Sequence, residues 1–244
     1  MSQHEQPRAM KVLMVVSNPA VSGQTGWPIG FWWGELTHPY WEFTQAGYEV
    51  TIASPLGGAL VGDAYSDPED ESGYAADDFV SLGFKHSPSH RTLIENTVQL
   101  SDLDLNGFDA ALFVGGQAPM YTFRGNSMIE SAVRTMLEAG KPTALMCHAT
   151  STLLDARGSA GRLLVDGKKW TGFSNAEEDY VDAAVGQKLQ PFRIEDEARR
   201  IKNTTFVTGP MFAPFVVQDG NLITGQQQNS GAAAARTIIK TLGN

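Results

Sequence analysis

Four short apolar segments limit the folds that this chain can adopt. They lie at residues 11–17 (KVLMVVS), 49–55 (EVTIASP), 109–116 (DAALFVGG) and 142–147 (PTALMC). Continuous apolar runs of this length are typical of strands that are buried on both faces of a sheet. A further segment, residues 216–225 (VVQDGNLITG), predicts a hairpin or a pair of strands at the sheet edge.

Helical patterns separate the apolar segments. Residues 127–141 place Met128, Ala132 and Met136 at helical spacing, and Gly140 provides a stop. The same reasoning predicts further helices at residues 34–47, 148–158, 191–201 and 231–242. Strands that alternate with helices indicate βαβ units, so we expect an α/β fold with a mainly parallel sheet and helices on both of its faces.

Composition narrows the domain organisation and the classes of partner. The 244 residues carry 18 Lys and Arg against 27 Asp and Glu, a net charge of −9, and no basic cluster, which argues against nucleic acid and anionic membranes as partners. No apolar run approaches the length of a bilayer span, and a single cysteine fits a cytoplasmic protein. We expect one domain over residues 1–244, with a flexible tail at 1–10 and an excursion at 56–91.

The single cysteine, Cys147, lies where an apolar strand runs into the next predicted helix. Such a turn holds a nucleophile in a tight position, and a helix N-terminus favours thiolate, which would lower the cysteine pKa. The alternative is a small buried apolar side chain, because free cysteine is often buried. The surroundings of the thiol decide between the two.

Two other features are predicted at the same edge of the sheet, where the carboxyl ends of parallel strands meet. Gly115 and Gly116 follow a strand, and a glycine pair there lets backbone N–H groups approach a ligand or an oxyanion. Glu35 starts the helix that follows the first strand and its loop, so its carboxyl group is placed to exchange a proton with the thiol. An ordinary turn and a helix-terminal carboxylate are the alternatives.

A base for the thiol is available next to it in the sequence. His148 follows Cys147 directly and would need a third group to orient its imidazole. Glu177 and Glu178, in the segment TGFSNAEEDYV, are candidates for that group. A solvated acidic helix start is the alternative for this pair. No spacing of histidines, cysteine and acids is typical of a metal site.

These segments together resemble the ThiJ/PfpI superfamily over nearly the whole chain. GELTHP, the VGG turn, the Cys–His elbow and TGFSNAEE occur in the order and spacing of that superfamily. Among its branches, the sequence is most similar to the heat-shock chaperones with glutathione-independent glyoxalase III activity. The resemblance implies a flavodoxin-like three-layer sandwich, no cofactor, a small carbonyl substrate and a homodimer.

The resemblance also implies roles for single residues. Cys147 would be the nucleophile, Glu35 the acid beside it, His148 the partner of the thiol and Glu177 the carboxylate that orients His148, with Glu178 close enough to contest that role. The N–H groups around Gly116 and of His148 would be the oxyanion donors.

The sequence departs from the superfamily pattern at two places. Gln117 and Ala118 replace the His-Gly of a GGHG turn, and Ala149 replaces the glycine of a CHG elbow. Gln117 can donate and accept hydrogen bonds, but it cannot titrate as histidine does. We therefore place Gly115, Gly116 and Gln117 in the substrate-binding turn and leave the substrate open.

Three hypotheses follow from the sequence. The first is a cofactor-free glyoxalase III-like lyase that converts methylglyoxal or related 2-oxoaldehydes to D-2-hydroxy acids through a hemithioacetal, with His148 or Glu35 as the base. The second is a cysteine-dependent hydrolase or hydratase that uses the same site. The third is a stress holdase chaperone or a redox sensor that responds through Cys147.

Overall fold

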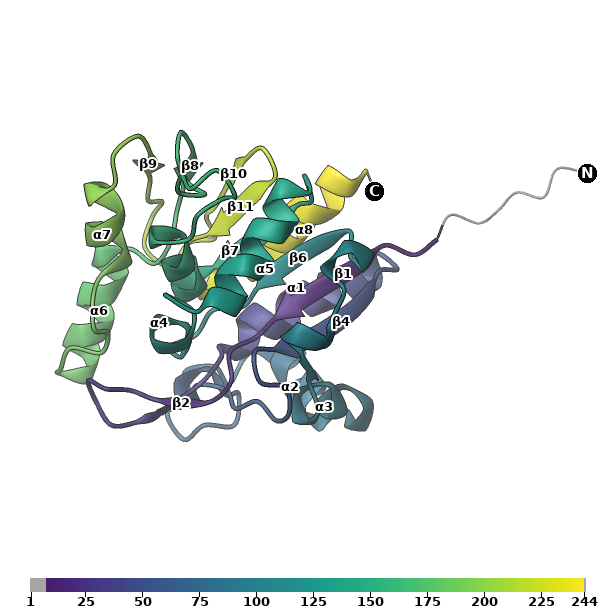
Figure 1. The fold of residues 1–244 in the computed structure, drawn as a ribbon. Helices are drawn as coiled ribbons and strands as arrows, with labels where there is room; N and C mark the ends of the chain where they lie inside the picture. The colour runs from purple at the N-terminus through teal and green to yellow at the C-terminus, as the bar shows by residue number, and fades with distance from the viewer. Residues whose placement is uncertain (1–7, 244) are drawn as a thin grey trace, which may run out of the picture.

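A seven-stranded sheet organises residues 8–243, the part of the chain that the computed structural model describes (Figure 1). The strand order is β10-β11-β7-β6-β1-β4-β5, and only the β10–β11 pair at one edge is antiparallel. The parallel core consists of β1 (Lys11–Val15), β4 (Glu49–Ser54), β6 (Ala110–Phe113) and β7 (Thr143–Met146). This arrangement confirms the predicted α/β fold, and the four strands coincide with the four apolar segments.

The edges of the sheet use shorter strands. They are β5 (Val98–Gln99) on one side and β11 (Leu222–Gly225) with β10 (Val216–Asp219) on the other, the last two as the predicted edge pair. Two small pairs lie outside the main sheet: β2 (Ala20–Val21) with β3 (Pro28–Ile29), and β8 (Lys169–Trp170) with β9 (Thr205–Phe206).

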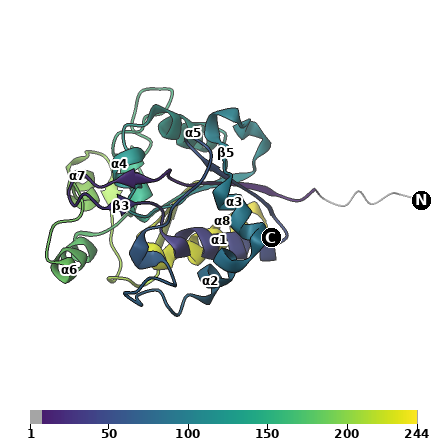
Figure 2. The ribbon, with the colours of Figure 1, turned by 90° about the horizontal axis from the view of Figure 1, so that it is seen from below.

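Helices cover both faces of the sheet, as the sequence predicts. The helices α1 (Trp33–Gln45) and α8 (Gly231–Leu242) lie side by side on one face, and α5 (Ser127–Glu138) lies on the opposite face (Figure 2). The helix predicted at residues 191–201 is α7 (Ile194–Arg200). The remaining α-helices are α2 (Phe79–His86), α3 (Pro88–Glu95), α4 (Pro119–Thr122) and α6 (Asn175–Val185).

The segment after β7 differs from its prediction. An α-helix was expected at residues 148–158, but the chain forms a 3₁₀ helix, η4 (Cys147–Leu154), in which every side chain is buried. Its Ser and Thr residues are weak helix formers that bond to nearby backbone groups instead, and Thr150 donates its hydroxyl to the carbonyl of Cys147 at 2.6 Å. Other short 3₁₀ turns lie at Ala64–Ser66, Leu100–Asp102, Leu105–Gly107 and Gln228–Ser230.

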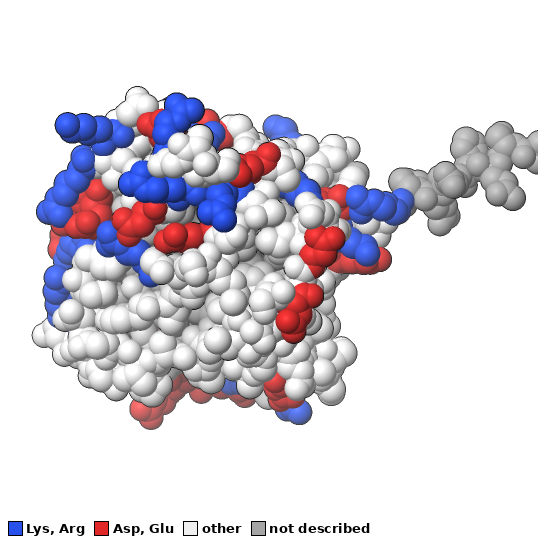
Figure 3. All heavy atoms as spheres, in the orientation of Figure 1, with Lys and Arg blue, Asp and Glu red and all other residues white. Residues whose placement is uncertain are grey.

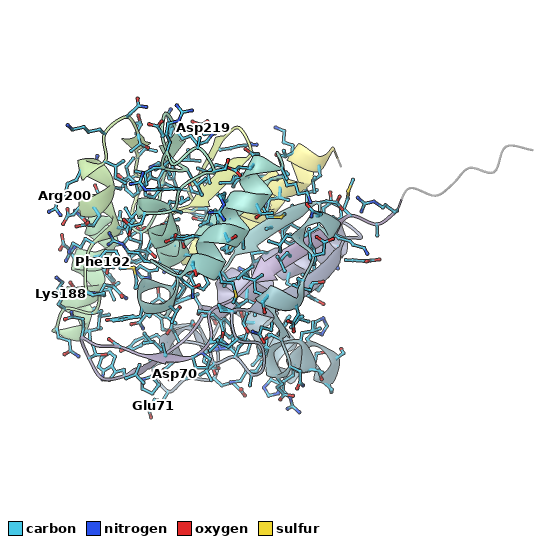
Figure 4. All side chains as sticks on the ribbon, in the orientation of Figure 1. Asp70, Glu71, Lys188, Phe192, Arg200 and Asp219 are labelled. Carbon is cyan, nitrogen blue, oxygen red and sulfur yellow. The ribbon has the colours of Figure 1, made fainter. Side chains whose placement is uncertain are left out.

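Residues 56–91, the predicted excursion, leave β4 and contain the 3₁₀ turn at Ala64–Ser66, α2 and the start of α3. The labelled side chains of Asp70 and Glu71 mark its outer part at the lower edge of the molecule (Figure 4). Its inner part pairs with the chain before α1, where Phe31 forms a parallel bridge with Gly62. The excursion is thus joined to the segment that leads into the helix of Glu35.

The predicted flexible tail falls mainly on residues 1–7, which lie outside the described residues. From Arg8 onward the chain is described, and the guanidinium of Arg8 forms an exposed ion pair with Asp109 at 2.6 Å. Within residues 8–243, none of the helices combines the length and the apolar character needed to cross a bilayer.

Candidate active site

Cys147 follows the last residue of β7 directly, at the carboxyl edge of the parallel strands. Its backbone adopts φ 51°, in the left-handed region that residues with a Cβ rarely occupy, and the residue is only 3% exposed. A strained turn at the end of a central strand is the geometry of a nucleophile elbow. The predicted elbow is therefore present, although its thiol is almost removed from solvent.

His148 lies beside the thiol and faces two acceptors. Its Nδ1 is 3.7 Å from Cys147 Sγ and 3.1 Å from the carbonyl oxygen of Gly116, and its Nε2 is 2.9 Å from Glu178 Oε1. A carbonyl and a carboxylate both require a proton on the nitrogen that they face, so the contacts favour the doubly protonated imidazolium. Burial opposes this charge, but the charge of Glu178 and its hydrogen bond outweigh burial and raise the pKa of His148.

Glu178, rather than Glu177, is the carboxylate that contacts His148. The prediction that Glu177 orients the histidine is wrong in its geometry, because successive helical residues point in directions about 100° apart. Only one of the two neighbours can face the elbow, and the capping box at the start of α6 assigns that direction to Glu178. The alternative of a solvated acidic helix start is also wrong, because Glu177 is 0% and Glu178 3% exposed.

Glu177 instead organises the backbone around the site. One of its oxygens accepts the N–H of Ser174 at 3.0 Å and its hydroxyl at 2.8 Å, which completes the capping box. The other accepts the N–H of Phe212 and the side-chain amide of Gln226, both at 2.9 Å. Glu177 therefore joins α6 to the loop that contains Phe212, itself held at φ 55°.

Glu35 lies in the first turn of α1 and is fully buried. Its Oε2 accepts the N–H of Gly115 at 2.9 Å, while Oε1 has no hydrogen-bond partner of normal geometry within the described chain. Burial raises the pKa of this carboxyl group to about 7, against the opposing effects of the Cys147 thiol, His148 and Gly115 N–H. Glu35 is consequently poised to hold or release a proton near neutral pH.

The Gly115–Gly116 turn brings these groups together because it has no side chains. A Cβ on Gly115 would collide with Glu35 Oε2 and come within 2.8 Å of Cys147 Cβ, so only glycine fits between the acid and the thiol. Gly116 adopts φ 110° and lies against the backbone of residues 30–32. The N–H groups of Gly116 and His148 lie close enough to the Cys147 sulfur to oppose a rise in its pKa.

The thiol does not have the lowered pKa that the sequence predicts. Burial, followed by the charge and contact of Glu35, raises the pKa of Cys147 well above its ordinary value, although the N–H groups of His148 and Gly116 oppose the rise. Burial thus outweighs the backbone N–H donors near the start of η4. The thiol of Cys147 and the carboxyl group of Glu35 are adjacent and buried, and such a pair favours a single shared proton. The thiolate forms when this proton moves to Glu35.

Asp63 is a buried residue of the site that sequence reasoning missed. It lies in the excursion, is 1% exposed and accepts the backbone N–H groups of Gly30 and Gln117. Gln117, predicted to bind substrate, thus enters the site through its backbone. No local pattern distinguishes it from the acids that follow in the sequence, of which Glu69 and Glu71 are exposed. Across residues 8–243, no three or more His, Cys, Asp and Glu side chains are grouped to hold a metal ion.

The strain at the elbow leads to a prediction. Because glycine adopts φ 51° without steric cost, Cys147→Gly should be more stable than Cys147→Ala by about 1 kcal/mol. Ala149, buried two residues later, has no positive φ, and there Ala149→Gly should destabilise the protein by about 1 kcal/mol. Urea unfolding of the variants measures both. Equal stability of the two Cys147 variants would contradict strain at this residue.

The burial of Glu35 predicts a pH-dependent stability. The pKa of this acid rises on folding to about 7, so the folded state binds its proton more tightly and loses stability as the pH rises from about 4.5 to about 7. Between pH 4.5 and 8, Glu35→Gln should gain stability relative to wild type, on the order of 3 kcal/mol. Denaturant unfolding at several pH values measures the difference. The exposed Glu71→Gln variant is the control, and a flat difference for Glu35→Gln would oppose the assignment.

The chain is similar to known proteins over most of its length. A sequence profile of the DJ-1/PfpI family matches residues 30–241, which include every site residue described above. Glyoxalase 3 of Candida albicans is 24% identical over 209 residues, covering 84% of this chain and 86% of that protein. A probable glutathione-independent glyoxalase of Schizosaccharomyces pombe is 25% identical over 230 residues, covering 85% and 88%. A deglycase of Pyrococcus horikoshii is 31% identical over 152 residues, covering 62% and 71%.

Solved structures share the fold. The 24 kDa Rapid Encystment Protein of Francisella tularensis superposes with a TM-score of 0.85 at 27% identity, covering 96% of this chain and all of that one. The matched segment contains the elbow, the glycine turn and the helix of Glu35, on which the resemblance in the sequence rested. The sequence match and the shared architecture agree, and the chain belongs to the DJ-1/PfpI family.

Proposed function

We propose that the protein is a cofactor-free glyoxalase III-like enzyme that converts methylglyoxal or a related 2-oxoaldehyde to the D-2-hydroxy acid. The observation that carries the proposal is Glu35, a fully buried acid with one unpartnered oxygen beside the buried thiol and a pKa of about 7. Isomerising a 2-oxoaldehyde requires a nucleophile and a base that returns the proton it removes. The relatives named glyoxalases support the same reaction class.

The first step forms the hemithioacetal. The proton of Cys147 moves to Glu35, and the thiolate attacks the aldehyde carbon, C1. The N–H groups of Gly116 and His148, which face the sulfur, and the positive imidazolium of His148 stabilise the oxyanion on O1. Glu35 then protonates O1 and becomes a carboxylate, ready to act as a base.

The second step moves a proton between two carbons. Glu35 removes the C1 hydrogen as a proton, and the electron pair forms the C1–C2 double bond of an enediolate, with the negative charge on O2. The same proton returns to C2 while the hydroxyl proton of O1 passes to O2, which leaves the thioester of a 2-hydroxy acid on Cys147. Water hydrolyses the thioester and regenerates the thiol, so the net reaction consumes one water molecule.

The contacts of His148 favour Glu35 as the base in this proposal, because they place a proton on both imidazole nitrogens. With both ring nitrogens facing acceptors, His148 has no lone pair available for the C1 proton in the resting site. Its role in the proposal is to supply positive charge beside the sulfur, as Glu178 stabilises that charge. These contacts support Glu35 rather than His148 as the base in the proposal.

The surface supports an uncharged substrate. Residues 12–34 and 110–123, which run from β1 and β6 toward the site, contain no Asp, Glu, Lys or Arg, so they offer no basic side chain to a phosphate or carboxylate. In Figure 3, Lys and Arg gather over the upper part of the displayed face, while the part over β2 and α4 is almost uncharged. A neutral 2-oxoaldehyde suits these uncharged segments better than an anionic substrate does.

The thiol and the acid are tested by turnover. Without glutathione, the wild type should form D-lactate from methylglyoxal, Cys147→Ala should lose at least ~10³-fold in kcat, and Glu35→Gln about 10²–10⁴-fold. Enzymatic assay of D-lactate measures all three. Turnover that survives Cys147→Ala would refute the mechanism. A folded wild type without turnover would refute the substrate and favour hydrolysis at the same thiol, which the relative named a deglycase keeps as the second candidate.

The adjacent acids Glu177 and Glu178 provide a matched pair of variants that tests the role of His148. Glu178→Gln removes the charge that stabilises the imidazolium and should lower kcat about 10-fold or more at pH 7, while the backbone contacts of the α6 capping box stay in place. Glu177→Gln points an amide at donors of the capping box and should instead lower the free energy of unfolding by about 1–3 kcal/mol. The reverse pattern would show that the roles of the two residues are exchanged.

A further inference from the structure

We propose that Asp63 is a positioning residue of the cysteine site, whose carboxylate holds the Gly116–Gln117 peptide in the orientation that His148 requires. The sequence offers no motif for this role, and the residue contacts neither the thiol nor the imidazole through a hydrogen bond. Its two carboxylate oxygens accept backbone N–H groups from two different segments, Gly30 at 2.8 Å and Gln117 at 2.7 Å.

The link to His148 follows from the covalent structure of the backbone. The carbonyl of Gly116 and the N–H of Gln117 belong to one planar peptide group. Asp63 binds the N–H end of this group, and His148 Nδ1 binds the carbonyl end at 3.1 Å. Any rotation of the peptide that breaks the first contact also turns the carbonyl away from the imidazole. Asp63 therefore acts on the ring through a rigid unit.

The N–H groups on either side of Gly116 are both held by acids. Gly115 N–H donates to Glu35 and Gln117 N–H donates to Asp63, while the intervening Gly116 N–H faces the sulfur of Cys147. A glycine with φ 110° has unusual backbone freedom, so its orientation depends on these two anchors. The arrangement leaves the Gly116 N–H to face the sulfur or an oxyanion, while the two acids hold the N–H groups of Gly115 and Gln117.

The same turn of the excursion also holds the helix that carries Glu35. The carbonyl of Asp63 accepts the hydroxyl of Ser66 at 2.7 Å, and Ser66 Oγ in turn accepts the N–H of Trp33, the first residue of α1, at 3.1 Å. The N–H of Asp63 donates to the carbonyl of Phe31 at 2.7 Å. The Asp63–Ser66 turn thus joins the excursion both to the Gly116–Gln117 peptide and to the start of α1.

A carboxylate is the side chain that this position requires. Both oxygens face N–H donors, and an asparagine would present its NH₂ group to one of them. Burial raises the pKa of Asp63 to about 7, against the two N–H donors and the charge of His148. The titratable groups near it are Glu35 on α1 and His148 on η4, and the two acids repel each other. Asp63 is therefore a buried carboxyl group whose hydrogen bonds in the described chain come from backbone N–H groups, which suits a role in holding the site.

The test compares Asp63→Asn with Asp77→Asn, an exposed acid of the same excursion, in full-length ¹⁵N-labelled protein. NMR should show both ring nitrogens of His148 protonated at pH 7 in the wild type and in Asp77→Asn. In Asp63→Asn, the Nδ1 proton should exchange with water at least ~10-fold faster, and the Gln117 amide about 100-fold faster. An unchanged His148 ring and Gln117 amide in folded Asp63→Asn would overturn the proposal.

Turnover provides a second readout, which rests on the proposed function. Asp63→Asn should lower kcat for methylglyoxal about 10–100-fold and change KM less than ~3-fold, because the reacting groups lose alignment while the substrate contacts remain. Loss through KM alone would overturn the positioning role. If the wild type forms no D-lactate, the proposed function fails, but the NMR comparison still decides the role of Asp63.

The wild type by itself supplies a measurement that does not depend on the folding of a variant. If Asp63 holds the Gln117 amide, that amide should exchange at least ~10³-fold more slowly than in an unstructured peptide. Exchange at the unstructured rate would overturn the proposal whether or not Asp63→Asn folds. A protected Gln117 amide in the wild type, together with a disturbed His148 ring in folded Asp63→Asn, is the expected result.

Discussion

A thiol that is 3% exposed and held at φ 51° is the constraint on which the rest of the site depends. Water cannot solvate a thiolate in this position, so the neighbouring groups have to stabilise the charge. Gly116 N–H comes from the turn after β6, the imidazolium of His148 from η4, and the exchangeable proton of Glu35 from α1. These groups meet because β6 lies between β1 and β7 in the sheet.

Four acids are buried in and around the site, and they divide into two kinds by what they accept. Glu35 and Glu178 face the reactive groups, one beside the sulfur and one on His148. Asp63 and Glu177 accept only from backbone N–H groups and from Ser174 and Gln226, and so they hold the chain. Backbone and amide donors satisfy a buried carboxylate without bringing a second charge into the interior. This division explains how adjacent residues of α6 have separate roles.

The sequence predicted the sheet and much of the site, and its errors have identifiable physical causes. Continuous apolar runs identified the four central strands, and parallel strands place their carboxyl ends at one edge, which brought Cys147, Gly116 and Glu35 together. The helix after Cys147 was wrong because complete burial and Ser and Thr side chains favour a 3₁₀ helix there. The lowered cysteine pKa was wrong because desolvation, which a sequence does not display, outweighs the N–H donors.

By itself, the sequence predicted which segments form the central strands and most of the helices, and the edge of the sheet at which Cys147, Gly116 and Glu35 meet. These follow from local patterns, because burial on both faces and the end of a strand leave direct marks in neighbouring residues. Only the tertiary structure decided that Glu178 contacts His148, that both imidazole nitrogens face acceptors, and that Asp63 reaches the Gln117 amide from 54 residues away. Each depends on the direction of a side chain across a contact between distant segments, and no local pattern records that direction.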